Sequence, residues 1–203
     1  MQNLNAKTLF WMSERRAVAL QLLEKHTASF VGVPRASGQD VVALREQGRR
    51  VVLIDVRTLA ERAVSMLPDA ISAPEFEAEC MSSPDGFRDA IIVPYCTIGY
   101  RSGLYCRRLR AGEFLSGALD VRNGDGVVMW SHDVGKFEGG ARRVHVYGAA
   151  WDVAAEGFET LRFDLTGNIL AAISVVASWM LLIRVWVWRR LTGSPSEQKS
   201  KCI

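Results

Sequence analysis

The stretch that decides the fold is residues 91–109, IIVPYCTIGYRSGLYCRRL. An apolar, β-branched run ends on Cys96, a short loop continues to Arg101, and the residues after Ser102 have the composition of a helix. The sequence therefore places Cys96 between the end of a strand and the start of a helix. Unpaired N–H groups at that helix start, together with Arg101, would stabilise a thiolate. We predict that Cys96 is a nucleophile, and the alternative is a free cysteine buried as a small hydrophobic residue.

A second buried strand is predicted at residues 51–55, VVLID, because a continuous apolar run of this length is typical of strands covered on both faces. Asp55 ends the run, and Arg57 and Glu61 follow it. We predict a structural ion pair among these three residues, since a charge at the end of a core strand needs a partner. A direct catalytic role for Arg57 is the less favoured alternative.

Strand, loop and helix patterns alternate along the rest of the chain. A helix is expected over residues 39–47 with Ser37 as its N-cap, a further strand at residues 118–121, and a turn at residues 123–126. Residues 1–30 read as a helical lead-in with Ser13 as a possible N-cap, and residues 32–38 as a linker. This alternation predicts an α/β fold with a central parallel sheet flanked by helices. Ligands of such sheets bind beyond the carboxyl ends of the strands, which is where Cys96 falls.

Composition excludes several classes of protein. The 203-residue chain has a net charge of +3 with scattered basic residues, so we expect no nucleic-acid partner. Its four cysteines and three histidines lack the spacing of metal ligands, so no metal and no cofactor are expected. The charged first thirty residues do not resemble a secretory signal, and a reactive thiol then favours a reducing compartment.

Several spaced motifs between residues 37 and 160 resemble the rhodanese (sulfurtransferase) family. They are residues 53–57 (LIDVR) with Glu61, residues 67–70 (LPDA), residues 96–102 (CTIGYRS), and the segment 126–130. The resemblance implies a rhodanese-like central parallel sheet flanked by helices, with Cys96 accepting a sulfane sulfur as a persulfide and passing it to a thiol or to cyanide. It also implies a small sulfur donor such as thiosulfate or a persulfide. The loop that would bind the persulfide or the anionic oxygens of the donor consists of Thr97, Ile98, Gly99, Tyr100, Arg101 and Ser102.

The length of the loop distinguishes between chemistries on related folds. Four residues separate Cys96 from Arg101, whereas related phosphatases and arsenate reductases have five, so the tighter loop favours sulfur. Pro94 departs from the pattern because it removes a hydrogen-bond donor from a central strand. Cys106 is expected to face the core.

Other polar and aromatic residues are expected to be structural. His132 and His145 are read as hydrogen-bonded structural histidines, because transfer to a preformed thiolate needs no strong base. Trp130 and Trp151 are expected in the core, with a pocket wall as the alternative.

A membrane anchor is predicted at residues 169–188, ILAAISVVASWMLLIRVWVW. The run has roughly the 20 residues that cross a bilayer, Arg184 can extend toward the headgroups, and Trp186 and Trp188 suit the interface. We expect a single-pass, tail-anchored protein in contact with membrane lipid, with its domain in a reducing compartment and a mitochondrial membrane favoured. The basic residues of the tail, taken alone, would instead keep the tail in the cytoplasm and place the domain on the other side of the membrane.

The predicted organisation is a helical lead-in (1–36), a rhodanese-like domain (37–160), a transmembrane helix (167–190) and a short basic tail (191–203). The predicted function is that of a membrane-anchored sulfurtransferase. One alternative is a non-catalytic subunit or scaffold with this fold, bound to other subunits of a membrane complex. Another is a thiol redox sensor that forms a Cys96–Cys106 disulfide.

Overall fold

A four-stranded parallel sheet forms the centre of the molecule. The computed structural model describes residues 6–83, 85–114, 120–162 and 180. Within them the sheet has the order β3-β2-β4-β5, and every pairing is parallel. The strands are β2 (Val51–Asp55), β3 (Ile71–Ser72), β4 (Ile91–Tyr95) and β5 (Asp120–Val121). The predicted parallel α/β architecture is confirmed.

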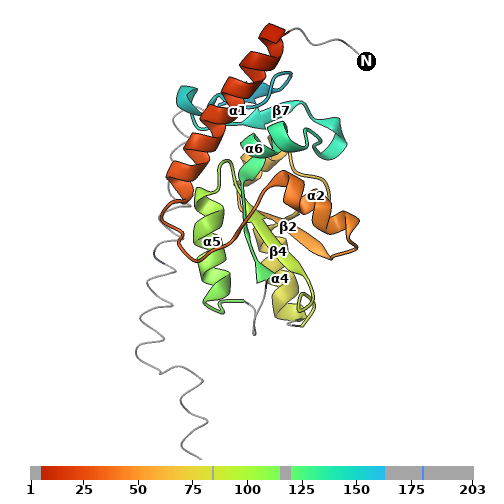
Figure 1. Cartoon of the computed structure of the whole chain (residues 1–203). Coiled ribbons are helices and arrows are strands. Elements are labelled where there is room, and N and C mark those ends of the chain that lie inside the picture. Colours follow the sequence, from red (N-terminus) through yellow and green to blue (C-terminus); the bar gives the residue numbers. More distant parts are fainter. Residues whose placement is uncertain (1–5, 84, 115–119, 163–179, 181–203) are drawn as a thin grey trace, which may run out of the picture.

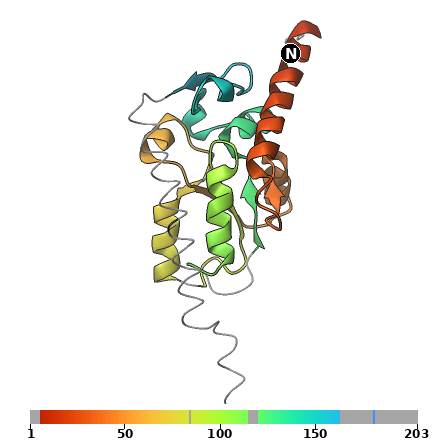
Figure 2. The same ribbon diagram turned by 90° about the vertical axis from the view of Figure 1, so that its left-hand side faces the viewer.

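The two long strands supply side chains to both faces of the sheet. Because neighbouring side chains of a strand point to opposite faces, Leu53 and Val93 enter one core while Ile54 and Ile92 enter the other. The helices α4 (Ala73–Ser82) and α5 (Tyr100–Arg110) cover one face, as Figure 2 shows, and α2 (Gly38–Glu46) and α6 (Gly126–Asp133) contribute to the core on the other. This double cover explains why residues 51–55 and 91–95 are apolar apart from Asp55 at the end of β2.

Capping boxes begin three of the helices. Ser37 caps α2 as predicted, Thr58 caps α3 (Leu59–Val64), and Ser72 caps α4. In each box an acidic residue at the third helical position accepts a hydrogen bond from the backbone N–H of the cap. In α3 this acidic residue is Glu61, so the sharp turn after β2 fixes a carboxylate at the carboxyl end of the sheet.

The N-terminal helix α1 (Ala6–Thr27) packs against the domain. It begins before Ser13, so the predicted N-cap is wrong. Ala19 and Leu23 are buried in the same core as α6, whereas Ala17 is exposed. Figure 1 shows α1, α6 and β7 (Arg143–His145) over the same end of the sheet.

Two small parallel pairs lie outside the main sheet. β1 (Arg35–Ala36) pairs with β6 (Asn123–Gly124), and β7 pairs with β8 (Glu159–Leu161). The predicted linker at 32–38 thus contains a strand, and Asn123–Gly124, predicted as part of a turn, is a strand paired to it. The remaining short helices are η1 (Glu138–Gly140) and η2 (Ala149–Trp151).

Pro94 lies inside β4 without breaking it. The N–H of Ile91 donates to Arg50 on the β2 side, and successive residues of a strand alternate in direction, so the nitrogen of Pro94 faces the other edge. There β5 pairs only with Ile91 and Ile92, which leaves no strand residue opposite Pro94 in this sheet. The lost donor is therefore tolerated.

The predicted membrane helix (167–190) lies outside the described residues except for Met180. Of the helices in the described ranges, none is both long and apolar enough to cross a bilayer.

Candidate functional site

Cys96 follows β4 directly and is only 2% exposed. The helix α5 begins at Tyr100, three residues before the predicted start, which places Ser102 in its first turn. The hydroxyl of Ser102 lies 3.5 Å from Cys96 Sγ, within hydrogen-bond range of sulfur. The structure therefore combines a sheltered thiol, a helix start and a hydroxyl donor at the carboxyl end of a central strand.

The first turn of α6 forms hydrogen bonds with the start of the loop. The N–H groups of Val127 and Val128 donate to the carbonyls of Cys96 and Thr97 at 2.9 and 3.2 Å. The approach is so close that a Cβ on Gly126, whose φ is +90°, would lie 2.6 Å from the Thr97 carbonyl oxygen. Only glycine fits at this position.

A second tether acts on Gly99, the N-cap of α5, which has a φ of +86°. The side-chain amide of Asn123 donates to the Gly99 carbonyl at 2.9 Å, and the N–H of Gly103 donates to the same oxygen at 3.1 Å. Asn123 precedes α6 in the chain, so both tethers come from the segment 123–128.

These tethers determine where the loop N–H groups point. In a trans peptide the carbonyl and the following N–H point in opposite directions. The N–H groups of Thr97 and Ile98 therefore face away from α6, and that of Tyr100 faces away from Asn123. Among the described residues, the N–H groups of residues 97–102 have no hydrogen-bond acceptor. Free N–H groups at a helix start are a site for negative charge.

Arg101 is held by a carboxylate that the sequence did not assign to it. Its Nη1 donates to Glu61 Oε2 at 2.8 Å and its Nη2 to Glu61 Oε1 at 2.6 Å, and Nη2 also reaches Thr97 Oγ1 at 3.3 Å. Burial alone would raise the pKa of Glu61, but hydrogen bonds from Arg101 and His145 lower it far below its ordinary value. Arg101 thus has a tightly bound partner and braces the loop against α3.

Asp55 and Arg57 form a separate ion pair. Both are fully buried side chains, and Arg57 Nη2 lies 2.7 Å from Asp55 Oδ2. The hydroxyl of Tyr95 donates to the same oxygen at 2.7 Å. Of the three residues predicted to pair, Asp55 and Arg57 are therefore joined, while Glu61 belongs with Arg101.

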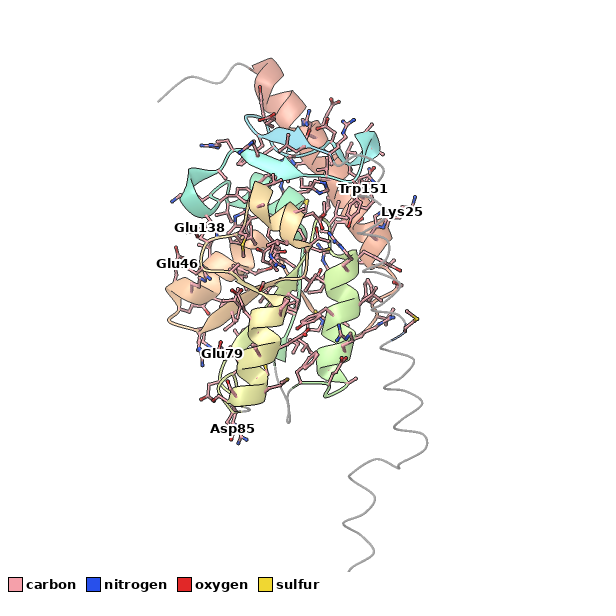
Figure 3. All side chains as sticks on the ribbon, turned by 180° about the vertical axis from the view of Figure 1, so that it is seen from behind. Lys25, Glu46, Glu79, Asp85, Glu138 and Trp151 are labelled. Atoms are coloured by element: carbon pink, nitrogen blue, oxygen red, sulfur yellow. The ribbon has the colours of Figure 1, made fainter. Side chains whose placement is uncertain are left out.

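Side chains from two distant segments cover the loop: Thr27 and His26 of α1 and Trp151 of η2. We call these three side chains the roof of the loop. A Cβ on Gly99 would lie 2.7 Å from Thr27 Cγ2 of α1. The ring of His26 contacts Trp151 of η2 in a tilted arrangement at 4.5 Å and meets Tyr100 edge-on at 6.3 Å. Figure 3 shows Trp151 beside the C-terminal part of α1, near Lys25.

Sequence reasoning missed two residues at this site. The composition around Asn123 predicts only a turn, although its amide orients the loop. Tyr147 was not assigned a role, although its ring lies 5.1 Å from the Arg101 guanidinium. No local pattern identifies either residue, because each reaches the loop from a distant part of the sequence.

The remaining predicted residues have structural surroundings. Cys106 is fully buried in the core beneath α5 as expected, and burial raises the pKa of its thiol. Trp130 is in the core, whereas Trp151 is half-buried and forms part of the roof. His132 is hydrogen-bonded to the Val153 carbonyl at 2.7 Å. Over the described ranges, no cluster of three or more His, Cys, Asp or Glu side chains is placed to hold a metal ion.

Comparison with known proteins gives structural similarities only. No protein-family model matches the sequence, and no curated protein matches it. The human single-domain sulfurtransferase TSTD1 is 24% identical, with 50% of this chain and 98% of that one covered and a TM-score of 0.39. Thiosulfate sulfurtransferase from Pseudomonas aeruginosa is 18% identical, with 78% and 27% covered and a TM-score of 0.44.

A third similar structure has a different description. RPA3614 from Rhodopseudomonas palustris, a protein of unknown function described as a possible tyrosine phosphatase, is 21% identical, with 58% and 90% covered and a TM-score of 0.38. We therefore infer the function from the geometry of the site itself.

Proposed function

We propose that this protein is a sulfurtransferase that carries a sulfane sulfur on Cys96 as a persulfide. The observation that carries the proposal is the loop after Cys96, whose N–H groups are free and turned away from the segment that tethers their carbonyls. The terminal sulfur of a persulfide is anionic, and such N–H groups at a helix start stabilise it. Ser102 supplies a further donor 3.5 Å from Sγ.

The proposed reaction has two steps and needs no oxidant. The Cys96 thiolate attacks the outer sulfur of thiosulfate, the S–S bond of thiosulfate breaks, and sulfite leaves with the bonding electron pair. A thiol or cyanide then attacks the terminal sulfur of the persulfide. The new S–S bond breaks and returns the thiolate of Cys96, while the acceptor leaves with the sulfur.

The state of Arg101 supports sulfur over phosphoryl transfer. A phosphoryl group is bound best by an arginine whose two terminal nitrogens can form a bidentate contact. Here both terminal nitrogens of Arg101 already donate to Glu61, at 2.8 and 2.6 Å. Together with the four residues between Cys96 and Arg101, this arrangement fits a single charged sulfur better than three phosphoryl oxygens.

We also propose that the chain is anchored to a membrane by residues 169–188, in a mitochondrial membrane and with the domain in a reducing compartment. The support is the length and apolar composition of this run and the basic tail after it. The proposed partners are membrane lipid and a small sulfur donor. Subunits of a membrane complex are the partners in the non-catalytic alternative.

Turnover tests the enzyme proposal. With thiosulfate and cyanide as substrates, we expect the wild-type chain to form thiocyanate, and Cys96→Ser to lose at least about a thousandfold in rate because the nucleophile is gone. Cys106→Ala is the matched control, since Cys106 is a buried cysteine of the adjoining helix, and it should retain activity. Equal rates in wild type and Cys96→Ser would overturn the proposal and favour a non-catalytic subunit.

A further inference from the structure

Tyr147 belongs to the candidate site although it is distant from the loop in sequence. It follows β7, and its ring lies 5.1 Å from the guanidinium of Arg101. On its other sides the ring meets His145 at 5.9 Å and Trp151 at 6.0 Å. The aromatic ring therefore lies between Arg101, which holds the loop, and Trp151.

The hydroxyl of Tyr147 is buried without a hydrogen-bond partner among the described residues. The other buried tyrosine hydroxyls are paired: that of Tyr95 donates to Asp55 at 2.7 Å, and that of Tyr105 to Glu77 at 3.0 Å. A buried hydroxyl without a partner destabilises the fold, because it loses its bonds to water and gains none. A phenylalanine would supply the same ring without that penalty, so the hydroxyl requires an explanation beyond packing.

Electrostatics connects this hydroxyl to the thiol. Burial raises the pKa of Tyr147, and negative charge on Glu61 and on Cys96 raises it further, against the opposite effect of Arg101. The group therefore stays protonated at neutral pH and can only donate to an anion. Its neighbour Arg101 carries the positive charge of the site.

We propose that the Tyr147 hydroxyl binds the anionic donor, donating a hydrogen bond to a sulfonate oxygen of thiosulfate while the outer sulfur of the donor meets Cys96. This inference rests on the proposed sulfurtransferase function and assigns a donor-binding residue to it. It also defines the substrate class as a donor whose leaving group carries oxygen atoms. A donor such as polysulfide, which offers only sulfur as a weaker acceptor, gains less from the hydroxyl.

The test compares Tyr147→Phe with wild type. Loss of one hydrogen bond to a charged oxygen should raise the KM for thiosulfate about tenfold or more, and should raise the KM for polysulfide less, because sulfur is the weaker acceptor. The thermal midpoint of unfolding without ligand should equal or exceed that of wild type, because the unpaired hydroxyl is removed. The matched control is Tyr105→Phe, which removes a paired hydroxyl from the opposite core and should lower the midpoint without affecting the KM.

Binding without turnover separates this inference from the proposed function. In the unreactive Cys96→Ser background, calorimetry with thiosulfate should show about tenfold weaker binding when Tyr147→Phe is added. Equal affinities, or a lower unfolding midpoint of Tyr147→Phe with an unchanged KM, would overturn the role of Tyr147 and leave the sulfurtransferase intact. Weaker thiosulfate binding in a protein that never forms a persulfide would sustain the binding residue and reject the enzyme.

Discussion

Glu61 is the residue on which the geometry of the loop depends most. It is fully buried and accepts hydrogen bonds from the backbone N–H of Thr58 at 3.0 Å and from both terminal nitrogens of Arg101. His145 Nδ1 lies 3.4 Å away from its Oε1. One carboxylate thereby joins the cap of α3, the loop of α5 and the strand β7.

The buried pair of Glu61 and Arg101 predicts a loss of stability in acid. Since the folded-state pKa of Glu61 is depressed, its contribution is present above the ordinary value of 4.5 and is lost as the pH falls below it. Glu61→Gln should lower the free energy of unfolding at neutral pH by about 3–5 kcal/mol, because Arg101 stays buried without its partner. The measurement is urea unfolding at a series of pH values.

The acid dependence gives the control for this prediction. Wild type should lose stability on acidification more steeply than Glu61→Gln, which has no carboxylate to protonate at this position. Glu75→Gln, at the equivalent position of the capping box of α4, should remove a smaller part of the wild-type dependence, because hydrogen bonds from Ser72 lower the pKa of Glu75 but no buried arginine depends on it. Parallel pH profiles of wild type and Glu61→Gln would contradict the account.

At the level of elements, α1 covers the loop after Cys96 and also contributes to the core. Thr27 and Leu23 leave no room for a Cβ on Gly99, with ideal separations of 2.7 and 3.0 Å. The contact joins the helical lead-in to the loop of Cys96. The N-terminal helix is therefore part of the site's architecture.

Gly99→Ala tests this contact between α1 and the loop. We expect it to lower the free energy of unfolding by about 1–2 kcal/mol for the positive φ, and by a further 1–3 kcal/mol or so for the clash with Thr27. Thr27→Ser removes Cγ2 while retaining the hydroxyl that donates to Leu23 at 2.8 Å. Adding it should recover the second part of the loss only, as measured by urea unfolding. Additive losses in the double variant would show that α1 does not press on Gly99.

The sequence predicts a helix or strand well when adjacent residues determine it, and poorly when distant contacts do. The strand at 51–55 and the cap at Ser37 follow from adjacent residues, and both predictions are confirmed. The start of α5 was placed too late because Gly99 caps it through a left-handed backbone conformation, without a side-chain signal. Asn123–Gly124 has the composition of a turn, and only its pairing with Arg35–Ala36 makes it a strand.

The same distinction applies to the site. Cys96 and its loop stand out because strand, cysteine, glycine and arginine are contiguous. The pairing of Arg101 with Glu61 joins residues 40 positions apart, and the sequence offered Arg57 as a nearer partner for that carboxylate. Asn123 and Tyr147 reach the loop only through tertiary packing, which the periodicity of the sequence does not predict.

For the whole molecule, the proposed membrane anchor makes a prediction that does not involve the active site. Val176 lies in the middle of the apolar run at 169–188, and an arginine there should cost about 3 kcal/mol of insertion free energy. When the full chain is expressed in cells, wild type should remain in the membrane pellet after alkaline extraction and Val176→Arg should be released. Release of both chains would reject the anchor.

If both proposals hold, the protein carries a sulfane sulfur beside a bilayer. The proposed chemistry uses one sulfur atom on Cys96, while Cys80 of α4 and Cys106 of α5 are buried in the core. Burial raises the pKa of Cys80 to about 11, so that thiol is a poor nucleophile at neutral pH. Among the three cysteines of the described residues, a sulfur added by the donor should therefore be confined to Cys96.

The most direct measurement of the central claim is the intact mass of the full chain after incubation with thiosulfate. The account predicts a gain of one sulfur atom, located on the peptide that contains Cys96, reversed by cyanide and absent in Cys96→Ser. The absence of any gain in wild type, or a gain that persists in Cys96→Ser, would contradict it.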